Sequence, residues 1–151
     1  DPARIHVVGK SSGSHLGGCA ALTDRQKDFG PPAATVKGYT LQSGMYDLRG
    51  PRLSKRSAYV RFTDAMEEDL SPQRHLDRIV APIALVYGSH ETPEFQRQSR
   101  DFAAALRQAG KPVELIFAQG HNHFEIAETL ANPYGIVGRA VLEQIGLMKK
   151  A

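Results

Sequence analysis

Cysteine is nearly absent from this sequence, and long apolar runs are absent altogether. Cys19 is the only cysteine, which excludes an internal disulfide and a cluster of thiolates that would hold zinc. No apolar run approaches the roughly 20 residues of a membrane span, and no charged and then apolar leader opens the chain. We therefore expect a soluble protein, and the lack of disulfides agrees with a cytoplasmic location.

An excess of charge in any one segment is also missing. The net charge of +3 is spread along the chain, without a basic block and without aromatic residues interleaved with basic ones. Although the sequence pI is near 9.1, this pattern argues against a nucleic acid partner, and no segment indicates a membrane. A small or neutral ligand fits better.

What the sequence does contain is the composition of one globular domain. Its 151 residues are 41% hydrophobic and 23% charged, which is sufficient for a sizeable core. The chain opens with DPARIHVVG, which has no methionine, and a strand pattern begins almost at once. We expect a fragment or a processed chain.

Strand and helix patterns alternate along the chain. Short runs rich in β-branched and apolar residues predict strands at 4–8, 35–43, 83–88 and 112–118. Helical patterns fall at 14–22, 92–110, 124–131 and 134–148; residues 24–35 are predicted as a Pro-rich loop, and 44–75 as a surface excursion with a short helix near 62–70. Because parallel neighbours need a crossover connection, the predicted fold class is α/β, with a mostly parallel sheet and helices on both faces.

One polar turn follows the first strand. Gly9-Lys10-Ser11-Ser12-Gly13 matches the G-x-S-x-G nucleophile elbow and lies between a predicted strand and a predicted helix. In this turn the serine takes a strained conformation, and we expect side chains at both glycine positions to collide with the neighbouring strand or helix. The turn lifts Ser11 Oγ out of the sheet and directs the Ser12 N–H, at the positive end of the helix, toward a developing oxyanion. Plain strand-to-helix turns also produce this short pattern, so the motif needs support from later loops.

The later loops carry the groups that such a serine needs. A serine hydroxyl requires an imidazole to take its proton, and the imidazole requires a carboxylate to orient it, in the chain order Ser, acid, His. Glu91 follows the strand at 83–88, and His121 and His123 follow the strand at 112–118. The order is therefore correct.

Other interpretations exist for the acid. Glu91 is the predicted acid, although a carboxylate there also suits the beginning of a helix. Glu94 and Asp101 are the alternatives, and both fall in the helical pattern that follows, where we expect them to be solvated.

The remaining histidines are assigned structural roles. We expect His6 and His15 to be packed or hydrogen-bonded, and His75 to face solvent. His90 together with the His121 and His123 pair is a loose zinc signal, and we do not predict a metal site. Met45 and Tyr46, after Ser43 and Gly44, line a pocket or belong to the core, and the sequence does not decide between these.

Side by side, the three loops resemble the α/β-hydrolase superfamily, and within it the arylformamidase (kynurenine formamidase) and related esterase branch. The elbow GKSSGSHLGG resembles the branch's G-H-S-[AS]-G-[AG]-H-L-A. SHETPEFQRQSRDFAAAL is similar to its H-D-S-P-E-F-x-R-Q-S segment, and NHFEIAETL to its D-H-F-D-I-I-E-x-L. Carried over by position, the resemblance implies Ser11 as nucleophile, Glu91 as acid and His123, which Phe124 follows directly, as general base.

The chain departs from this branch in three respects. Glu91 stands where the branch usually has Asp, which bears more on the substrate than on the mechanism. Lys10 replaces the usual histidine beside the nucleophile, and it either changes the charge of the pocket or points away. The His-Gly-Gly type loop that supplies the family's other oxyanion donors has no counterpart here.

The missing loop bears on domain organisation. Since a βαβ unit takes about 30 residues or more, this chain has room for about the last four strands of the family's sheet. We therefore expect residues 1–151 to be the C-terminal portion of a single α/β-hydrolase domain, with the N-terminal portion and its oxyanion loop absent from this chain.

The resemblance implies a serine hydrolase that cleaves a small amide or ester through an acyl-enzyme, with an aryl formamide such as N-formylkynurenine as its type of substrate. A general carboxylesterase or another amidase is the alternative, and a non-catalytic binding module on a hydrolase scaffold is a further one. No cofactor is implied. The expected partners are a small acyl substrate and the chain's own N-terminal segment, and the formation of a homodimer stays open.

Overall fold

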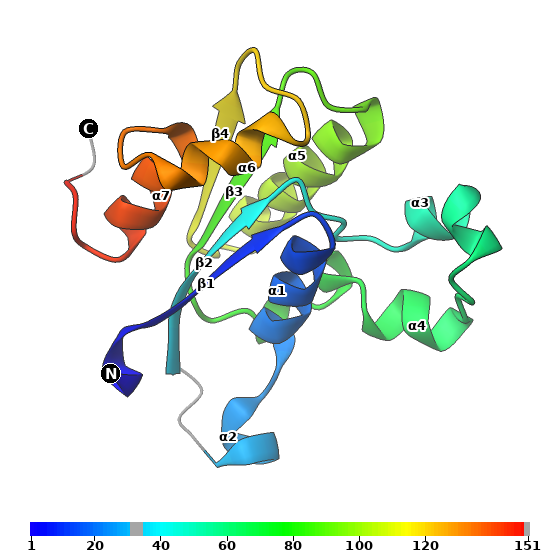
Figure 1. Ribbon diagram of the computed structural model, residues 1–151. Helices are drawn as coiled ribbons and strands as arrows, with labels where there is room; N and C mark the ends of the chain where they lie inside the picture. Colours follow the sequence, from blue (N-terminus) through cyan, green and yellow to red (C-terminus); the bar gives the residue numbers. More distant parts are fainter. Residues whose placement is uncertain (31–34, 150–151) are drawn as a thin grey trace.

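Four parallel strands form a single sheet and follow one another across it in chain order (Figure 1). The computed structural model describes residues 1–30 and 35–149. The strands are β1 (Ile5–Lys10), β2 (Val36–Gln42), β3 (Ile83–Gly88) and β4 (Val113–Ala118). Each neighbouring pair is parallel.

Helices occupy the connections between the strands. The longer ones are α1 (Ser12–Leu22), α5 (Pro93–Gln108) and α7 (Ile136–Gln144). The shorter ones are η1 (Pro2–Arg4), α2 (Arg25–Phe29), α3 (Arg49–Arg52), η3 (Lys55–Ala58), α4 (Asp64–Asp69), η4 (Pro72–Arg74), η5 (Leu76–Arg78), α6 (Glu125–Glu128) and η6 (Thr129–Ala131). Within residues 1–30 and 35–149, no helix combines the length and the apolar character that crossing a membrane requires.

The helices cover both faces of the sheet. Leu41 and Leu85 pack into a core cluster with residues of α1 and α5, whereas Thr40 Oγ1 donates to Gln144 Oε1 of α7 at 3.0 Å. Since neighbouring residues of a strand point to opposite faces, α7 lies on the face opposite α1 and α5. Val86 belongs to a second cluster with α6 and α7. The predicted α/β architecture is therefore confirmed.

The predicted elements agree with the observed ones except near their ends. The strand at 83–88 has its predicted bounds, and the other three differ by one or two residues. The helix predicted at 14–22 begins earlier, at Ser12, because the turn at Ser11 leads directly into it. The last helix is shorter than the predicted 134–148, since Gly135 precedes its first turn and Gly146 takes a positive φ of 76° after its last one.

The predicted loop at 24–35 contains a short helix. The side chain of Asp24 accepts a hydrogen bond from Lys27 N, which begins α2, and Gly30 ends it with a φ of 84°. Residues 31–34 of that predicted loop lie outside the described residues.

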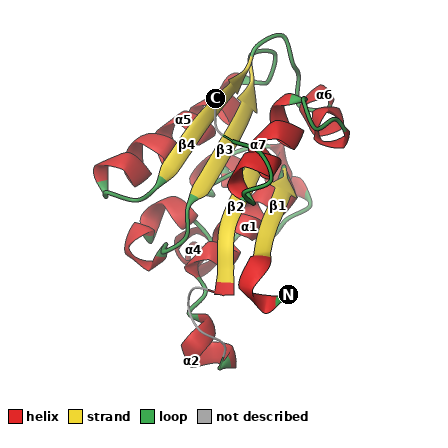
Figure 2. Cartoon of the chain, turned by 90° about the vertical axis from the view of Figure 1, so that its left-hand side faces the viewer, coloured by secondary structure: helices red, strands yellow, loops and turns green. Residues whose placement is uncertain are grey.

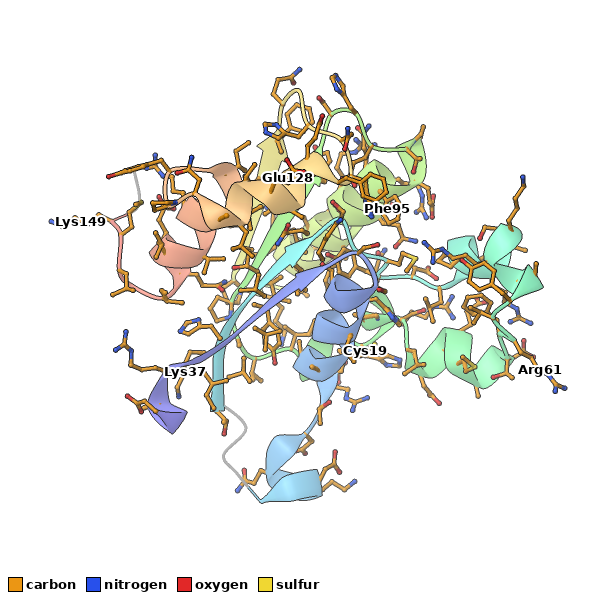
Figure 3. All side chains as sticks on the ribbon, in the orientation of Figure 1. Cys19, Lys37, Arg61, Phe95, Glu128 and Lys149 are labelled. Atoms are coloured by element: carbon orange, nitrogen blue, oxygen red, sulfur yellow. The ribbon has the colours of Figure 1, made fainter. Side chains whose placement is uncertain are left out.

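The excursion at 44–75 contains more helical turns than the one predicted near 62–70, which is α4. It projects beyond the sheet, with Arg61 at its outer tip (Figure 3). Gln98 of α5 anchors its beginning: Oε1 accepts from Tyr46 N at 2.8 Å and Asp47 N at 2.9 Å, and Nε2 donates to Asp47 O at 2.8 Å. Gln98 is 1% exposed. A buried side-chain amide thus replaces the regular backbone pairing that this segment lacks.

All four strands end at the same edge of the sheet (Figure 2). Beyond this edge the backbone pairing continues for one more residue. Ser11, Ser43 and Ser89, the first residues after β1, β2 and β3, each donate their N–H to a backbone carbonyl of the next strand, at 2.8, 2.8 and 3.1 Å. The loops that carry the candidate site residues therefore start from fixed, neighbouring positions.

Candidate active site

Ser11 forms the sharp turn between β1 and α1. Its φ of 54° and ψ of −116° lie outside the regions that L-residues favour, and Ser43 is the other non-glycine residue with a positive φ in the described part of the chain. The Ser11 carbonyl accepts hydrogen bonds from Ser14 N at 3.0 Å and His15 N at 3.1 Å, so the first turn of α1 holds the strained residue in place.

The two glycines of this turn are not equivalent. A Cβ on Gly9 would lie 2.5 Å from the Gly13 carbonyl oxygen, so α1 packs closely enough on β1 to require glycine there. A Cβ on Gly13 would meet no atom within 4 Å among the described residues. The prediction that side chains at both positions would collide is therefore wrong for Gly13, because the space that its Cβ would occupy is open among the described residues.

The loops after β3 and β4 are joined to each other by hydrogen bonds. His90 N donates to His121 O at 3.0 Å, and Gly120 N donates to Ser89 Oγ at 2.7 Å. A Cβ on Gly88 would overlap the His121 carbonyl oxygen, so the second loop passes directly over the end of β3. This packing directs His123 back toward β1.

Ser11, Glu91 and His123 meet at this edge in one hydrogen-bonded series. His123 Nε2 lies 3.0 Å from Ser11 Oγ, and His123 Nδ1 lies 2.6 Å from Glu91 Oε1. The other carboxylate oxygen, Glu91 Oε2, accepts from Gly88 N at 2.9 Å. Because a carboxylate only accepts, Nδ1 carries the proton and Nε2 is left to accept from the serine hydroxyl.

Burial differs along this series in a way that suits its chemistry. The Glu91 side chain is 0% exposed, and the His123 side chain is 20% exposed. A buried carboxylate keeps a fixed position and interacts strongly with the imidazole beside it, because little water screens the pair. The imidazole remains open to solvent and hence to a small molecule.

Two aromatic rings pack against the His123 imidazole. The Phe95 ring lies 4.4 Å from it, centroid to centroid, and the Phe124 ring meets it edge-on at 5.6 Å. Figure 3 labels Phe95 at this edge of the sheet. The helical pattern predicts that Phe95 lies on the buried side of α5 together with Phe102 and Leu106. In the structure Phe95 is half-buried and packs on the His123 imidazole, one turn before the buried part of α5 begins. The sequence feature that could have indicated this contact is the position of Phe95 near the start of the helix, directly after the loop that carries Glu91.

The alternative acids are engaged elsewhere. Glu94 Oε1 lies 2.7 Å from Arg97 Nη2, and Asp101 Oδ2 lies 2.7 Å from Arg97 Nη1. Hydrogen bonding to this guanidinium lowers the pKa of Glu94. Neither carboxylate reaches the imidazole, so Glu91 alone of the three does so.

Three other histidines lie within hydrogen-bond distance of backbone carbonyls. A ring nitrogen of His15 lies 2.8 Å from Leu70 O, one of His75 lies 2.8 Å from Glu68 O, and one of His121 lies 2.8 Å from Gln119 O. His75 is therefore bonded to the backbone rather than free in solvent. His6 is partly buried, which together with Arg4 lowers its pKa. No three metal-ligating side chains cluster within residues 1–30 and 35–149.

The segment after β2 is buried behind the serine turn. Tyr46 is fully buried and stacks on Phe102, with centroids 4.4 Å apart, and Met45 is also buried, so both belong to the core. Burial raises the pKa of Tyr46. Ser43 has a φ of 52°, and its hydroxyl is buried with no hydrogen-bond partner among the described residues. Nothing in the local pattern distinguishes Ser43 from an ordinary loop serine.

Ser12 provides a free donor next to the serine. Its N–H is the first amide of α1, and no described residue accepts a hydrogen bond from it. Lys10, on the other side of Ser11, does not point into solvent alone: its Nζ lies over the Phe124 ring, 4.9 Å from the centroid.

A hollow of about 440 Å³ lies at the opposite edge of the sheet. Pro82, Pro112, Glu143 and Gln144 are among its lining residues. They surround the amino ends of β3 and β4 and the end of α7, whereas Ser11 follows the carboxyl end of β1. The hollow therefore does not belong to the candidate active site.

No family model matches the sequence. The chain is similar to the kynurenine formamidase of Danio rerio, with 32% identity over 152 residues that cover 94% of this chain and 50% of that protein. It is also similar to the isoprenylcysteine alpha-carbonyl methylesterase of Arabidopsis thaliana, with 29% identity over 83% of this chain and 34% of that protein. The chain thus spans about half the length of the first relative and about a third of the second.

Solved structures share the fold. The acylaminoacyl peptidase of Pyrococcus horikoshii matches with a TM-score of 0.72 at 16% identity, over 100% of this chain and 26% of that chain. A thermophilic esterase from Thermogutta terrifontis matches with a TM-score of 0.69 at 21% identity, over 100% of this chain and 59% of that chain. At these identities the likeness concerns the arrangement of strands and helices.

Proposed function

We propose that this chain, which has the fold of the α/β-hydrolases and is related in sequence to kynurenine formamidases and carboxylic ester hydrolases, carries the reacting groups of a serine hydrolase. The relatives are hydrolases of esters and amides. One observation supports the serine mechanism above all others: Ser11, His123 and Glu91, from three separate loops, form a single hydrogen-bonded series, with distances of 3.0 and 2.6 Å.

The proposed reaction begins with Ser11. As its Oγ bonds to the carbonyl carbon of the substrate, the hydroxyl proton passes to His123 Nε2, and the imidazolium is stabilised by the Glu91 carboxylate. His123 then gives that proton to the departing amine or alcohol as the carbon–nitrogen or carbon–oxygen bond breaks. A water molecule next loses a proton to His123 and attacks the acyl-serine ester, and the return of the proton to Ser11 Oγ releases the acid.

The negative charge on the carbonyl oxygen requires donors. We assign one of them to the Ser12 N–H, which adjoins the nucleophile and begins an eleven-residue helix. The helix places a partial positive charge at that end, which favours an oxyanion.

The substrate is a small amide or ester. The kynurenine formamidase relatives favour an aryl formamide of the N-formylkynurenine type, and the methylesterase relatives favour a carboxylic ester. The formamide is the first candidate, on the similarity to kynurenine formamidase, and a general carboxylesterase is the second, because Glu91 in place of the usual Asp departs from the formamidase pattern. A binding module without catalysis is the competing class.

The test is made on the complete protein with a fluorophosphonate probe. We expect covalent labelling at Ser11, located by peptide mass, and none in Ser11→Ala. Glu91→Gln should lower kcat by about 10³–10⁴-fold, because the amide no longer stabilises the imidazolium. Glu94→Gln is the matched control and should leave kcat within a factor of about two, since an exposed pair contributes little.

Two outcomes would contradict the proposal. Folded protein that takes no label would favour the binding module, and equal losses in Glu91→Gln and Glu94→Gln would remove the assignment of the acid. A panel of formanilides and short-chain aryl esters then separates the two substrate classes by their kcat/KM values.

A further inference from the structure

An exposed aromatic ring and an unpaired ammonium lie together beside the reacting groups. Lys10 directly precedes Ser11, and Phe124 directly follows His123. The two side chains meet, with Lys10 Nζ 4.9 Å from the centre of the Phe124 ring. Lys10 and Phe124 therefore form a second contact between the same two chain segments that are joined by the 3.0 Å contact of Ser11 Oγ with His123 Nε2.

The Phe124 ring is largely uncovered. It is 73% exposed, although it lies perpendicular to the His123 imidazole with ring centroids 5.6 Å apart. Phe95, which also packs against this imidazole, is half-buried. A phenyl ring that contacts the general base and offers an open face to solvent is suited to stacking on a flat, apolar part of a substrate.

The Lys10 ammonium has no carboxylate partner. Among the described residues, no Asp or Glu lies within ion-pair distance of its Nζ, and the side chain is half-buried. Arg97, a cation near the start of α5, is by contrast occupied by Glu94 and Asp101. The aromatic face holds the ammonium without neutralising its charge, so the charge remains available to an anion.

We propose that Lys10 and Phe124 form a subsite for a substrate that carries a carboxylate on an aryl group, with the aryl ring on Phe124 and the carboxylate on Lys10. This subsite rests on the proposed serine hydrolase function, because it lies beside that reacting centre. It makes Lys10, which stands in place of the usual histidine, a specificity-determining residue.

The test compares two esters that share one acyl group. Phenyl acetate is neutral, and 2-carboxyphenyl acetate carries the carboxylate; the ratio of their kcat/KM values is measured for each variant of the complete protein. Since intrinsic reactivities cancel between variants, a change in this ratio reports only the protein's contribution. We expect Lys10→Met to lower the ratio, anionic over neutral, by about tenfold, or ~1.4 kcal/mol.

Two further variants separate charge from packing. Lys10→Arg keeps the charge and should hold the ratio within about threefold of the natural protein. Lys55→Met, on η3, removes the same charge from an exposed lysine and should leave the ratio unchanged. Added salt should shrink the ratio for the natural protein and leave it unchanged in Lys10→Met, because a partly exposed ion pair is screened.

Binding without turnover gives an independent readout. Benzoate, which has the ring and the carboxylate but no bond to cleave, should bind with a Kd about tenfold higher in Lys10→Met, whereas benzamide should bind both proteins alike. If both esters are hydrolysed and the ratio and the benzoate Kd do not change in Lys10→Met, the subsite is refuted and the hydrolase proposal stands. If neither ester is hydrolysed and Ser11 takes no probe, the hydrolase proposal fails, and the subsite fails with it. Should Lys10→Met not fold, the salt dependence of the natural protein decides.

Discussion

Replacing the two glycines of the serine turn one at a time should have opposite effects. In Gly9→Ala the new Cβ would lie 2.5 Å from Gly13 O, 2.7 Å from Gly13 C and 2.9 Å from Ser14 N. All three atoms belong to the backbone of the turn and of α1, so no side chain can rotate away to make room. In Gly13→Ala the new methyl group would meet nothing within 4 Å among the described residues.

The magnitudes follow from these contacts. To bring the new Cβ of Gly9→Ala from 2.5 Å to an ordinary contact of about 3.4 Å with Gly13 O, the start of α1 must move by about 0.9 Å, and such overpacking costs about 1–3 kcal/mol of stability. The same movement displaces Ser11 Oγ from its 3.0 Å contact with His123 Nε2, and a misplacement of this order lowers catalytic rates by about tenfold to a hundredfold. Gly13 has no positive φ and lies in the first turn of α1, where alanine should raise stability by about 0.5–1 kcal/mol.

Urea denaturation and the rate of fluorophosphonate labelling, both on the complete protein, measure the two effects. We expect Gly9→Ala to lose stability and labelling rate together, and Gly13→Ala to gain stability with a labelling rate near that of the natural protein. If Gly9→Ala matches the natural protein in both measurements, the close approach of α1 and β1 is not what positions the serine. Equal damage in both variants would instead show that Gly13 is covered.

Three other measurements address the rest of the chain. Gln98→Ala should lower the free energy of unfolding by about 2–4 kcal/mol, because it leaves buried backbone groups of the segment 44–75 without partners. Gln108→Ala, at an exposed position of the same helix, is the control and should change the free energy of unfolding by less than about 0.5 kcal/mol. Similar losses in both variants would contradict the anchoring role of Gln98. Burial raises the pKa of Cys19, so iodoacetamide should alkylate it about tenfold more slowly in the native protein than in urea, and equal rates would refute its protection. Hydrogen bonding to Arg74 lowers the pKa of Glu67 below its ordinary 4.5, so the ion pair stabilises the fold fully above that pH and is lost as the pH falls through the lower, folded pKa. The stability difference between the natural protein and Arg74→Met, from denaturation at several pH values, should therefore be constant near neutrality and shrink below about 4.5; a difference that persists in acid would be inconsistent with this linkage.

The sheet could be predicted from the sequence because its strands carry their own signal. The run at 83–88 has apolar side chains on both faces, as a strand covered by helices on both sides requires, and all six residues are buried. The helix at 14–22 shows a weaker signal, because it approaches the sheet through small residues such as Gly17 rather than through an apolar stripe. The observed start of this helix at Ser12 depends on the turn at Ser11, which is held by a hydrogen bond from Ser11 N to Gln42 O of the neighbouring strand. The comparisons confirm the expected α/β-hydrolase fold and the relationship to the formamidase and esterase branch.

The site was harder to predict than the fold. Residue type and loop order select Ser11, Glu91 and His123 as candidates, but several neighbouring residues depend on contacts that no local pattern encodes. Phe95 has an ordinary helical position and packs on the histidine because the loop after β4 folds back over it. Ser43 has an unremarkable sequence context, yet its φ is positive and its N–H donates to Val86 O at the end of β3.

The loop after β4 must cross a long distance to bring His123 to Ser11, so the loops between the strands matter as much as the three side chains. Ser11 follows β1 and His123 follows β4, so three strand spacings of about 4.8 Å, or roughly 14 Å, separate the strand ends from which they start. The loop after β4 covers this distance by passing over the end of β3, where Gly88 leaves room for the His121 carbonyl and where His90 N binds that same oxygen. Glu91, in the loop after β3, contacts the imidazole between the ends of β4 and β1. The position of the His123 imidazole against the Ser11 hydroxyl is therefore determined at Gly88 and His90, two residues that take no part in the hydrogen-bonded series, and the three side chains are brought together by the register of the parallel sheet.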